Sequence, residues 1–217
     1  LGLNYKYKAS PEKPFMVYGN DFDNSGSCDI VLGTYYGETI FPVRGKQCSS
    51  EQMPSLKKKF ASYDEFAKAD INQVYGDDLK EALHYKVDQF ATVVIYQDEP
   101  GKYSVQELPL ECQIAPTNGI VTTDINGDGN LDLILGGNLY QSEIETGRAD
   151  GGTGVIVLNE GNRRWKPMKV HESGLYISHD VKALELLELG KDKKPVLVVA
   201  NNKAKCQVIE LAEKPVM

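Results

Sequence analysis

The sequence predicts an all-β fold, a partial β-propeller of about three four-stranded blades with a small α-helical insertion. An Asp-rich loop between two strand-like runs occurs twice, and a degraded third copy follows. Further strand-like runs follow each copy, so that strands recur in up-and-down order. We therefore expect one domain over 1–217, with blades at about 14–110 and about 117–171 and a degenerate blade at about 180–212.

Composition narrows the class of protein. The 217 residues are 41% apolar and 25% charged, which is typical of a globular domain. The net charge is −7 without a basic block, which argues against nucleic acid as a partner. No apolar run approaches the roughly 18 residues of a membrane-spanning helix, so we expect no membrane insertion by this segment. The chain opens at Leu1 and reads as a piece of a longer protein.

The first repeat opens with Phe15–Gly19 as a strand, the acidic loop Asp21–Asp29 and Ile30–Gly33 as a second strand. The later runs Val87–Tyr96 and Tyr103–Leu108 are rich in β-branched and aromatic residues and flank a Pro-Gly turn. We expect these two runs to complete the first blade.

A stretch within the first repeat follows a helical pattern instead. Ser49–Gln52 and Ser62–Glu65 each match a capping box, and apolar residues recur at helical spacing after them. We expect two or three short helices in an insert at about 49–83. Because the flanking strands are assigned to one blade, the ends at Gly45 and His84 should lie close together, and the insert should be a separable lid. A partner-binding element is the alternative.

The second and third repeats are shorter. In the second, Gly154–Asn159 and Trp165–Val170 supply the third and fourth strands. The third consists of strand-like runs at Val181–Glu188, Val196–Ala200 and Cys206–Leu211. Because propellers use roughly four to eight blades, three repeats do not close a ring. We expect the remaining blades in a larger chain, or a partner that covers the open edges.

The second acidic loop carries oxygen ligands at alternating positions. Positions 1, 3, 5 and 9 offer side-chain oxygens and are Asp124, Asn126, Asp128 and Asp132. Position 7, Asn130, offers its backbone carbonyl. Calcium takes about six to eight oxygen ligands in flexible geometry, and the intervening glycines allow a tight wrap. The loop therefore predicts a Ca²⁺ site.

An EF-hand does not fit this pattern. That motif needs a bidentate Glu at position 12 and a helix on each side of the loop. Position 12 is Leu135 in the second loop and Leu32 in the first, and the flanking residues are strand formers.

The first acidic loop has the same spacing. Its ligand positions are Asp21, Asp23, Ser25, Ser27 and Asp29. Ser25 replaces a carboxylate by a hydroxyl, so we expect a weaker Ca²⁺ site than in the second loop. In the third repeat only Glu188 and Asp192 remain, and we expect no metal there. The alternative for both loops is an Asp/Gly-rich turn without an ion.

The four cysteines lack the C-x-x-C spacing of a zinc site. They are Cys28, Cys48, Cys112 and Cys206. Their even number allows two disulfides in any of three connectivities, and free thiols are equally compatible with the sequence.

The blade motifs resemble FG-GAP/VCBS repeats, as in integrin α-subunit propellers and many bacterial envelope proteins. Tyr18-Gly19 stands where the family has Phe-Gly. Runs beginning at Leu32, Leu135 and Val199 stand where it has Gly-Ala-Pro. The closest resemblance is to a bacterial VCBS-repeat group related to the cartilage acidic protein family. That resemblance rests on the helical insert and on the runs Leu1–Tyr5, Gly136–Tyr140 and Glu145–Asp150.

The resemblance implies a propeller of about seven blades, with calcium on the loop side of each intact blade. It also implies a place outside the cytoplasm, as a periplasmic protein, an outer-membrane lipoprotein or a secreted protein. The implied role is adhesion or ligand binding, with a protein or carbohydrate ligand at the cell surface. Ser25 and the degraded third loop depart from the family pattern.

Two classes of function follow. The first is a non-catalytic, calcium-binding module for ligand binding, adhesion or scaffolding. The alternative is a propeller-based carbohydrate-active enzyme, a lyase or hydrolase, whose active site is completed by missing blades. The three histidines, His84, His171 and His179, are scattered along the chain, and we assign no catalytic residue.

Aromatic residues beside amide and guanidinium groups suit carbohydrate or peptide binding. The candidates are Tyr35, Tyr36, Asn138, Tyr140 and Arg148. Packing between blades is the other interpretation of these residues.

Overall fold

The computed structural model describes residues 2–142 and 146–212, so Leu1 and Glu145 of the resemblance motifs lie outside the described residues. The chain forms two compact units, Lys6–Phe90 and Leu1–Tyr5 with Ala91–Met217, each described here by itself. Both units contain antiparallel sheets, and none of the sheets in the described ranges closes into a barrel. The predicted β-rich class is therefore confirmed at this coarse level.

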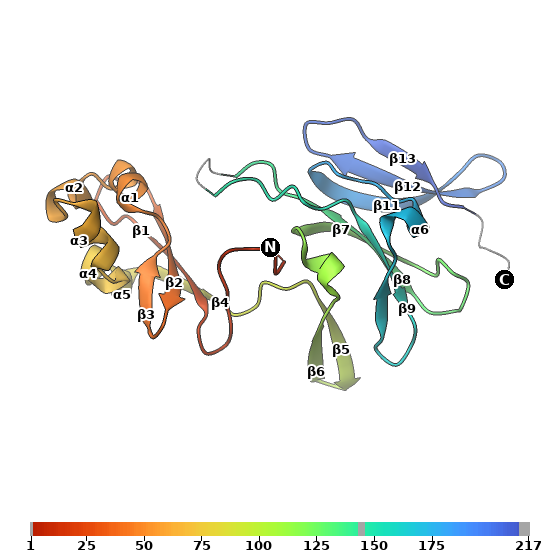
Figure 1. Ribbon diagram of the computed structural model, residues 1–217, viewed down its shortest axis with the longest axis horizontal. Helices are drawn as coiled ribbons and strands as arrows, with labels where there is room; N and C mark the ends of the chain where they lie inside the picture. The colour runs from red at the N-terminus through yellow and green to blue at the C-terminus, as the bar shows by residue number, and fades with distance from the viewer. Residues whose placement is uncertain (1, 143–145, 213–217) are drawn as a thin grey trace. The chain divides into compact units, whose positions relative to one another are not determined.

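The first unit, Lys6–Phe90, contains one four-stranded antiparallel sheet (Figure 1). Its strands are β1 (Phe15–Asn20), β2 (Asp29–Tyr36), β3 (Thr39–Pro42) and β4 (Leu83–Val87), in the order β3-β2-β1-β4. The first acidic loop joins β1 to β2, as the sequence predicts. The two strands from the middle of the sheet are therefore the ones that hold this loop.

Five short helices connect β3 to β4. They are α1 (Lys46–Gln52), α2 (Ser55–Lys59), α3 (Tyr63–Lys68), α4 (Ile71–Tyr75) and α5 (Asp78–Glu81). The predicted capping box at Ser62 is confirmed, because its side chain accepts a hydrogen bond from the Glu65 amide at 3.1 Å. The other predicted box is wrong: α1 begins three residues earlier, so Ser49 lies inside the helix.

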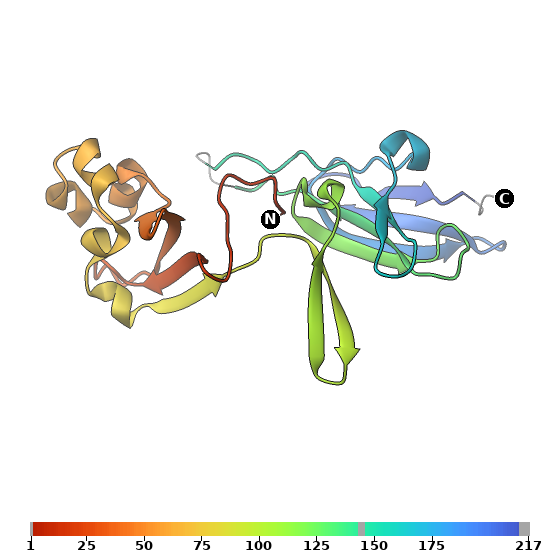
Figure 2. The same cartoon turned by 60° about the horizontal axis from the view of Figure 1, so that its bottom comes forward.

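The helices supply most of the core of the first unit, and Figure 2 shows them gathered beside its sheet. The sheet contributes Met16, Tyr18 and Val31, whereas the helices and their connections contribute Met53, Leu56, Phe66, Ala69, Ile71, Val74, Tyr75 and Leu79. The prediction of a separable lid is therefore wrong. Its ends are not neighbours either: β3 and β4 are opposite edges of the sheet, about 14 Å apart at the usual strand spacing.

In the second unit, the second repeat forms the four-stranded meander that the sequence predicts (Figure 1). Its strands are β7 (Thr117–Thr123), β8 (Asp132–Gly137), β9 (Val155–Asn159) and β10 (Trp165–Pro167), in the order β10-β9-β8-β7. β10 ends at Pro167, whereas the sequence predicted strand as far as Val170, and the short helix α6 (Val170–Ser173) follows. The second acidic loop joins β7 to β8, which is the position of the first loop in its own sheet.

The third repeat forms a three-stranded meander that shares a core with the second. Its strands are β11 (Val181–Leu189), β12 (Lys194–Asn201) and β13 (Gln207–Glu210). Ile134, Val181 and Leu197 are fully buried in the shared core. Glycine allows the close approach, because a Cβ on Gly119 would lie 2.7 Å from Cγ of Leu184.

The hairpin β5 (Val93–Glu99) and β6 (Lys102–Glu107) differs from the prediction, because it forms a separate two-stranded sheet and does not join the first blade. Side chains of the second unit hold it in place. The Gln113 side chain, at the end of the 3₁₀ helix η1 (Leu110–Gln113), exchanges hydrogen bonds with both backbone groups of Thr92 at 2.8 and 2.9 Å. The Trp165 indole donates to the Tyr96 hydroxyl at 2.6 Å.

All four cysteines are free thiols. Burial, together with the neighbouring Glu111 charge, raises the pKa of the Cys112 thiol to about 12, which makes it a poor nucleophile. In the described ranges, every helix is too short or too polar to cross a membrane.

The packing of the first unit generates a stability prediction. Ile71 is 1% exposed between the helices and the sheet, so Ile71→Ala should lower the free energy of unfolding by about 2–5 kcal/mol. Ile95, which is 63% exposed on β5, is the matched control, and Ile95→Ala should change it by less than about 0.5 kcal/mol. Urea titrations followed by circular dichroism measure both. Equal losses would contradict this account of the core.

Candidate calcium centres

The first acidic loop is closed by its own carboxylates. The Asp21 carboxylate accepts hydrogen bonds from the amides of Ser25 at 2.9 Å and Gly26 at 2.8 Å. Asp23 also accepts from the Ser25 amide, at 3.1 Å. Oxygens of Asp21, Asp23 and Asp29 lie within 4.8 Å of one another. Three like charges at this separation repel one another, so the loop favours a bound cation.

Asp29, the first residue of β2, orients this loop. Its carboxylate is buried, and one oxygen accepts from the Phe22 amide at 3.1 Å. The other oxygen accepts from Nε2 of Gln52 at 3.0 Å, and Oε1 of Gln52 accepts from Nη1 of Arg44 at 2.7 Å. The helical insert therefore positions a predicted ligand. Gln52 and Arg44 were not predicted from the sequence, because no local pattern connects them to a loop more than a dozen residues away.

The second acidic loop repeats this framework. One oxygen of Asp124 accepts from the amides of Gly127 at 2.7 Å and Asp128 at 3.1 Å, and the other accepts from Gly129 at 3.2 Å. Asn126 accepts from the Asp128 amide at 3.1 Å, as Asp23 does from Ser25. Gly127 and Gly129 have positive φ values of 79° and 88°, which explains why glycine is needed between the ligands.

Asp132 corresponds to Asp29. It is fully buried, and one oxygen accepts from the Ile125 amide at 2.9 Å. The other accepts from the backbone amide of Asn159 at the end of β9, at 2.8 Å. A neighbouring strand thus supplies here the donor that a helix side chain supplies in the first loop.

The two loops differ in where the third carboxylate lies. Asp128 accepts hydrogen bonds from the Asn130 amide at 2.8 Å and from Nδ2 of Asn126 at 3.1 Å. These bonds hold the pKa of the Asp128 carboxyl below its usual range and favour the charged form. Within the described residues, only the first loop brings three acidic side chains within 4.8 Å. The carboxylates of the first loop therefore lie closer together than those of the second, although the sequence predicted the first loop to be the weaker calcium site.

The third repeat has a tight hairpin in place of an acidic loop. Glu188 lies in β11, paired with Pro195 of β12, and its carboxylate is 3.9 Å from Nζ of Lys193. Gly190 and Lys193 take positive φ values in the turn. Glu188 is therefore a strand residue and does not stand at the start of a ligand loop.

Two of the candidate binding residues, Asn138 and Tyr140, make hydrogen bonds within the second unit. The Asn138 side chain is buried and donates to the carbonyls of Gly152, Ser178 and His179 at 2.9 to 3.1 Å. The hydroxyl of Tyr140 donates to the Ser178 carbonyl at 2.6 Å. These contacts favour the packing interpretation for both residues.

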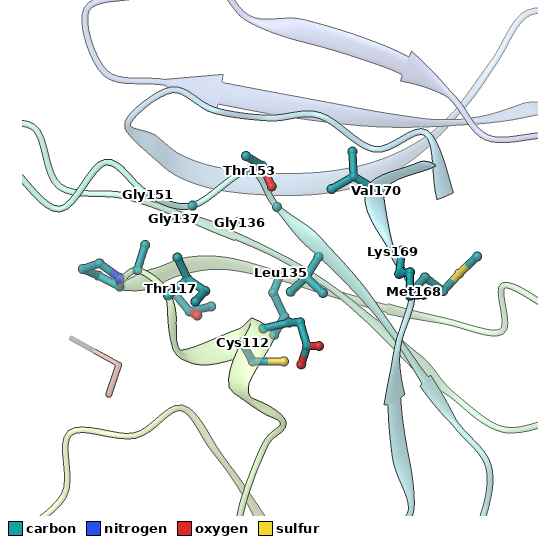
Figure 3. A pocket seen from close by; sticks show the side chains of 17 residues that line it. Cys112, Thr117, Leu135, Gly136, Gly137, Gly151, Thr153, Met168, Lys169 and Val170 are labelled. Carbon is teal, nitrogen blue, oxygen red and sulfur yellow. The ribbon is translucent and has the colours of Figure 1, made fainter. Parts of the chain in front are cut away.

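A pocket of about 320 Å³ lies beside β8, as Figure 3 shows. Glycines, which have no side chain, form part of its wall, among them Gly136, Gly137 and Gly151. Its ionisable lining groups are Glu111, the Cys112 thiol with its raised pKa, and Lys169. No histidine or pair of carboxylates is among the described residues that line it, so the pocket gives no support to the hydrolase or lyase alternative.

Comparison with family models, with curated proteins and with solved structures gives no match to this chain. The resemblance to FG-GAP/VCBS repeats therefore stays a prediction from the motifs. Function has to be inferred from the two loops and the surfaces beside them.

The contact between Gln52 and Asp29 generates a second prediction. Gln52→Ala removes a donor from a buried carboxylate, which should cost about 1–3 kcal/mol of unfolding free energy in EGTA. Gln47→Ala is the control, because Gln47 lies on the same helix and contacts only the side chain of Glu51 among the bonds described. Urea titration in EGTA compares the two. A loss with Gln47→Ala as large as with Gln52→Ala would contradict the assigned role.

Proposed function

We propose that this chain is a calcium-binding, extracytoplasmic β-propeller segment of the FG-GAP/VCBS type that acts as a non-catalytic binding, adhesion or scaffold module. One observation carries the proposal. Two loops in separate units hold the same pattern of amide-to-carboxylate hydrogen bonds around oxygen ligands at the same spacing. A turn selected only for its shape does not need an acidic residue at both the first and the ninth position, with oxygen-bearing side chains at the alternating positions between them.

The donor set of the first loop fits calcium. Asp21, Asp23 and Asp29 supply carboxylate oxygens, Ser25 a hydroxyl and Ser27 a backbone carbonyl, all of them hard ligands. The amide bonds orient the carboxylates and leave further lone pairs for a cation, since each carboxylate offers about four acceptor sites. Calcium supplies the charge that offsets the repulsion between the three acids.

The second unit supports the propeller part of the proposal. Two successive antiparallel meanders share one core, which is how neighbouring blades pack. The extracytoplasmic location follows from the resemblance to FG-GAP/VCBS repeats. Extracellular calcium modules have dissociation constants of about 10⁻⁴–10⁻³ M, so millimolar calcium would fill loops of that affinity.

Removal of calcium tests the proposal. Binding to the folded state alone should add roughly 1 kcal/mol per site at several times the dissociation constant, so calcium should raise the melting temperature and EGTA should reverse the rise. Asp21→Ala and Asp124→Ala should each remove a share of that rise. Asp192→Ala, in the hairpin turn of the third repeat, should remove none.

Melting curves with calcium and with EGTA measure these shares. An unchanged melting temperature of the wild-type chain in EGTA would refute calcium binding. A loss with Asp192→Ala equal to that with Asp124→Ala would refute the assignment of the loops.

A further inference from the structure

Two adjoining hollows lie on the first unit, where β3 meets α1, α2 and α3. One, of about 460 Å³, lies between the end of β3 and helices α1 and α3; the other, of about 440 Å³, lies beside α1 and α2. Lys46 and Tyr63 line both, so the two hollows adjoin at these side chains. Volumes of this size are typical of small-molecule sites. Neither hollow includes a ligand position of the first acidic loop.

Exposed aromatic rings form part of the lining. Tyr36 and Tyr63 are 64% and 65% exposed, although both are large and partly apolar. The Tyr36 ring meets Phe41 edge-on at 6.0 Å, and Nζ of Lys46 lies 5.2 Å from the Tyr63 ring centre. These contacts hold the rings in place at the surface, and rings held in this way offer flat faces to a ligand.

The charge around the hollows is opposite to that of the whole chain. Arg44, Lys46 and Lys57 line them, against the single carboxylate of Glu51. Glu51 already accepts a hydrogen bond from Nε2 of Gln47, at 3.1 Å. The chain as a whole carries −7, so this local excess of cations favours an anionic ligand.

A buried hydroxyl gives an independent sign of a missing partner. Ser50 is only 2% exposed and lines the second hollow, yet its Oγ has no hydrogen-bond partner within the described part of the chain. Unsatisfied buried polar atoms are rare in native proteins and cost free energy. Because Oγ itself is almost inaccessible, a ligand hydroxyl in this hollow would satisfy Ser50 once the side chains around it move apart.

We propose that the two hollows bind an acidic saccharide, whose sugar rings stack on Tyr63 and Tyr36 and whose carboxylates meet Lys46 and Lys57. Hydroxyl groups of the sugar would meet Ser50 and Gln47. An acidic peptide is less well served, because Pro42 in the edge strand β3 has no amide to pair with an added strand. This inference deepens the proposed binding role and rests on it, but it does not need calcium.

Calorimetric titration of the whole chain in EGTA tests the site with a galacturonate tetrasaccharide. Its methyl-esterified form is the matched ligand control, because it keeps the sugar rings and loses the charge. The acid form should bind, and the ester at least about tenfold more weakly. Lys46→Ala and Tyr63→Ala should each weaken binding of the acid form by about tenfold or more.

Two protein controls match these variants. Lys68→Ala removes the same charge from α3 outside both hollows, and Tyr103→Ala removes a ring as exposed as Tyr63 from the other unit. Neither should change binding. Ser50→Ala separates recognition from folding, because it should weaken binding without lowering the free energy of unfolding in EGTA.

The site is refuted by absence of galacturonate binding in EGTA, or by equal losses with Lys46→Ala and Lys68→Ala. Binding only in the presence of calcium would place the sugar at the acidic loops, and tighter binding of a glutamate tetrapeptide would assign the hollows to peptides. Either result overturns the inference while calcium binding stands. Galacturonate binding in EGTA, with no effect of calcium on the melting temperature, supports the inference and refutes the calcium proposal.

Discussion

A buried carboxylate at the start of the second strand organises each of the two acidic repeats. Asp29 begins β2 and Asp132 begins β8, and both are almost inaccessible to water. A charge in that position is costly unless donors surround it. Each carboxylate therefore requires one amide from its own loop and one donor from a neighbouring element. Loop, strand pair and neighbour are held together by this single requirement.

The two repeats meet the requirement in different ways. Asp132 receives its outer donor from the backbone amide of Asn159, so an ordinary adjacent strand is sufficient. Asp29 receives its outer donor from the side chain of Gln52, which belongs to the first of five helices. The helical insert is therefore bonded to the first loop. For this reason it is not an independent lid that could be removed from the sheet.

The same helices account for the character of the first unit. They cross from one edge of the sheet to the other and bury their apolar faces on it, so that sheet and helices share one core. Their outer surfaces are left with a cationic and aromatic lining around Lys46 and Tyr63. The proposed calcium site and the proposed saccharide site thus lie on opposite sides of one helix, α1. The hydrogen bonds of Gln52 to Asp29 and to Arg44 link them.

The sequence by itself determined the features that depend on neighbouring residues. Ligand spacing, glycine positions and strand composition located both acidic loops between paired strands, and successive strand-like runs predicted the meander of the second repeat. The Ser62 capping box was readable because its two partners are three residues apart. All of these signals are local, and local energetics were sufficient to produce them.

Only the tertiary structure decided which elements share a sheet or a buried contact. The hairpin β5–β6 belongs to the second unit because Gln113 and Trp165 bind it there, and no strand propensity records that choice. The hydrogen bond from Gln52 to Asp29 and the unpaired hydroxyl of Ser50 likewise arise from packing between distant segments. Burial converts these ordinary polar residues into determinants of the fold and of the candidate sites, because the cost of an unpaired polar group exists only once water has been excluded.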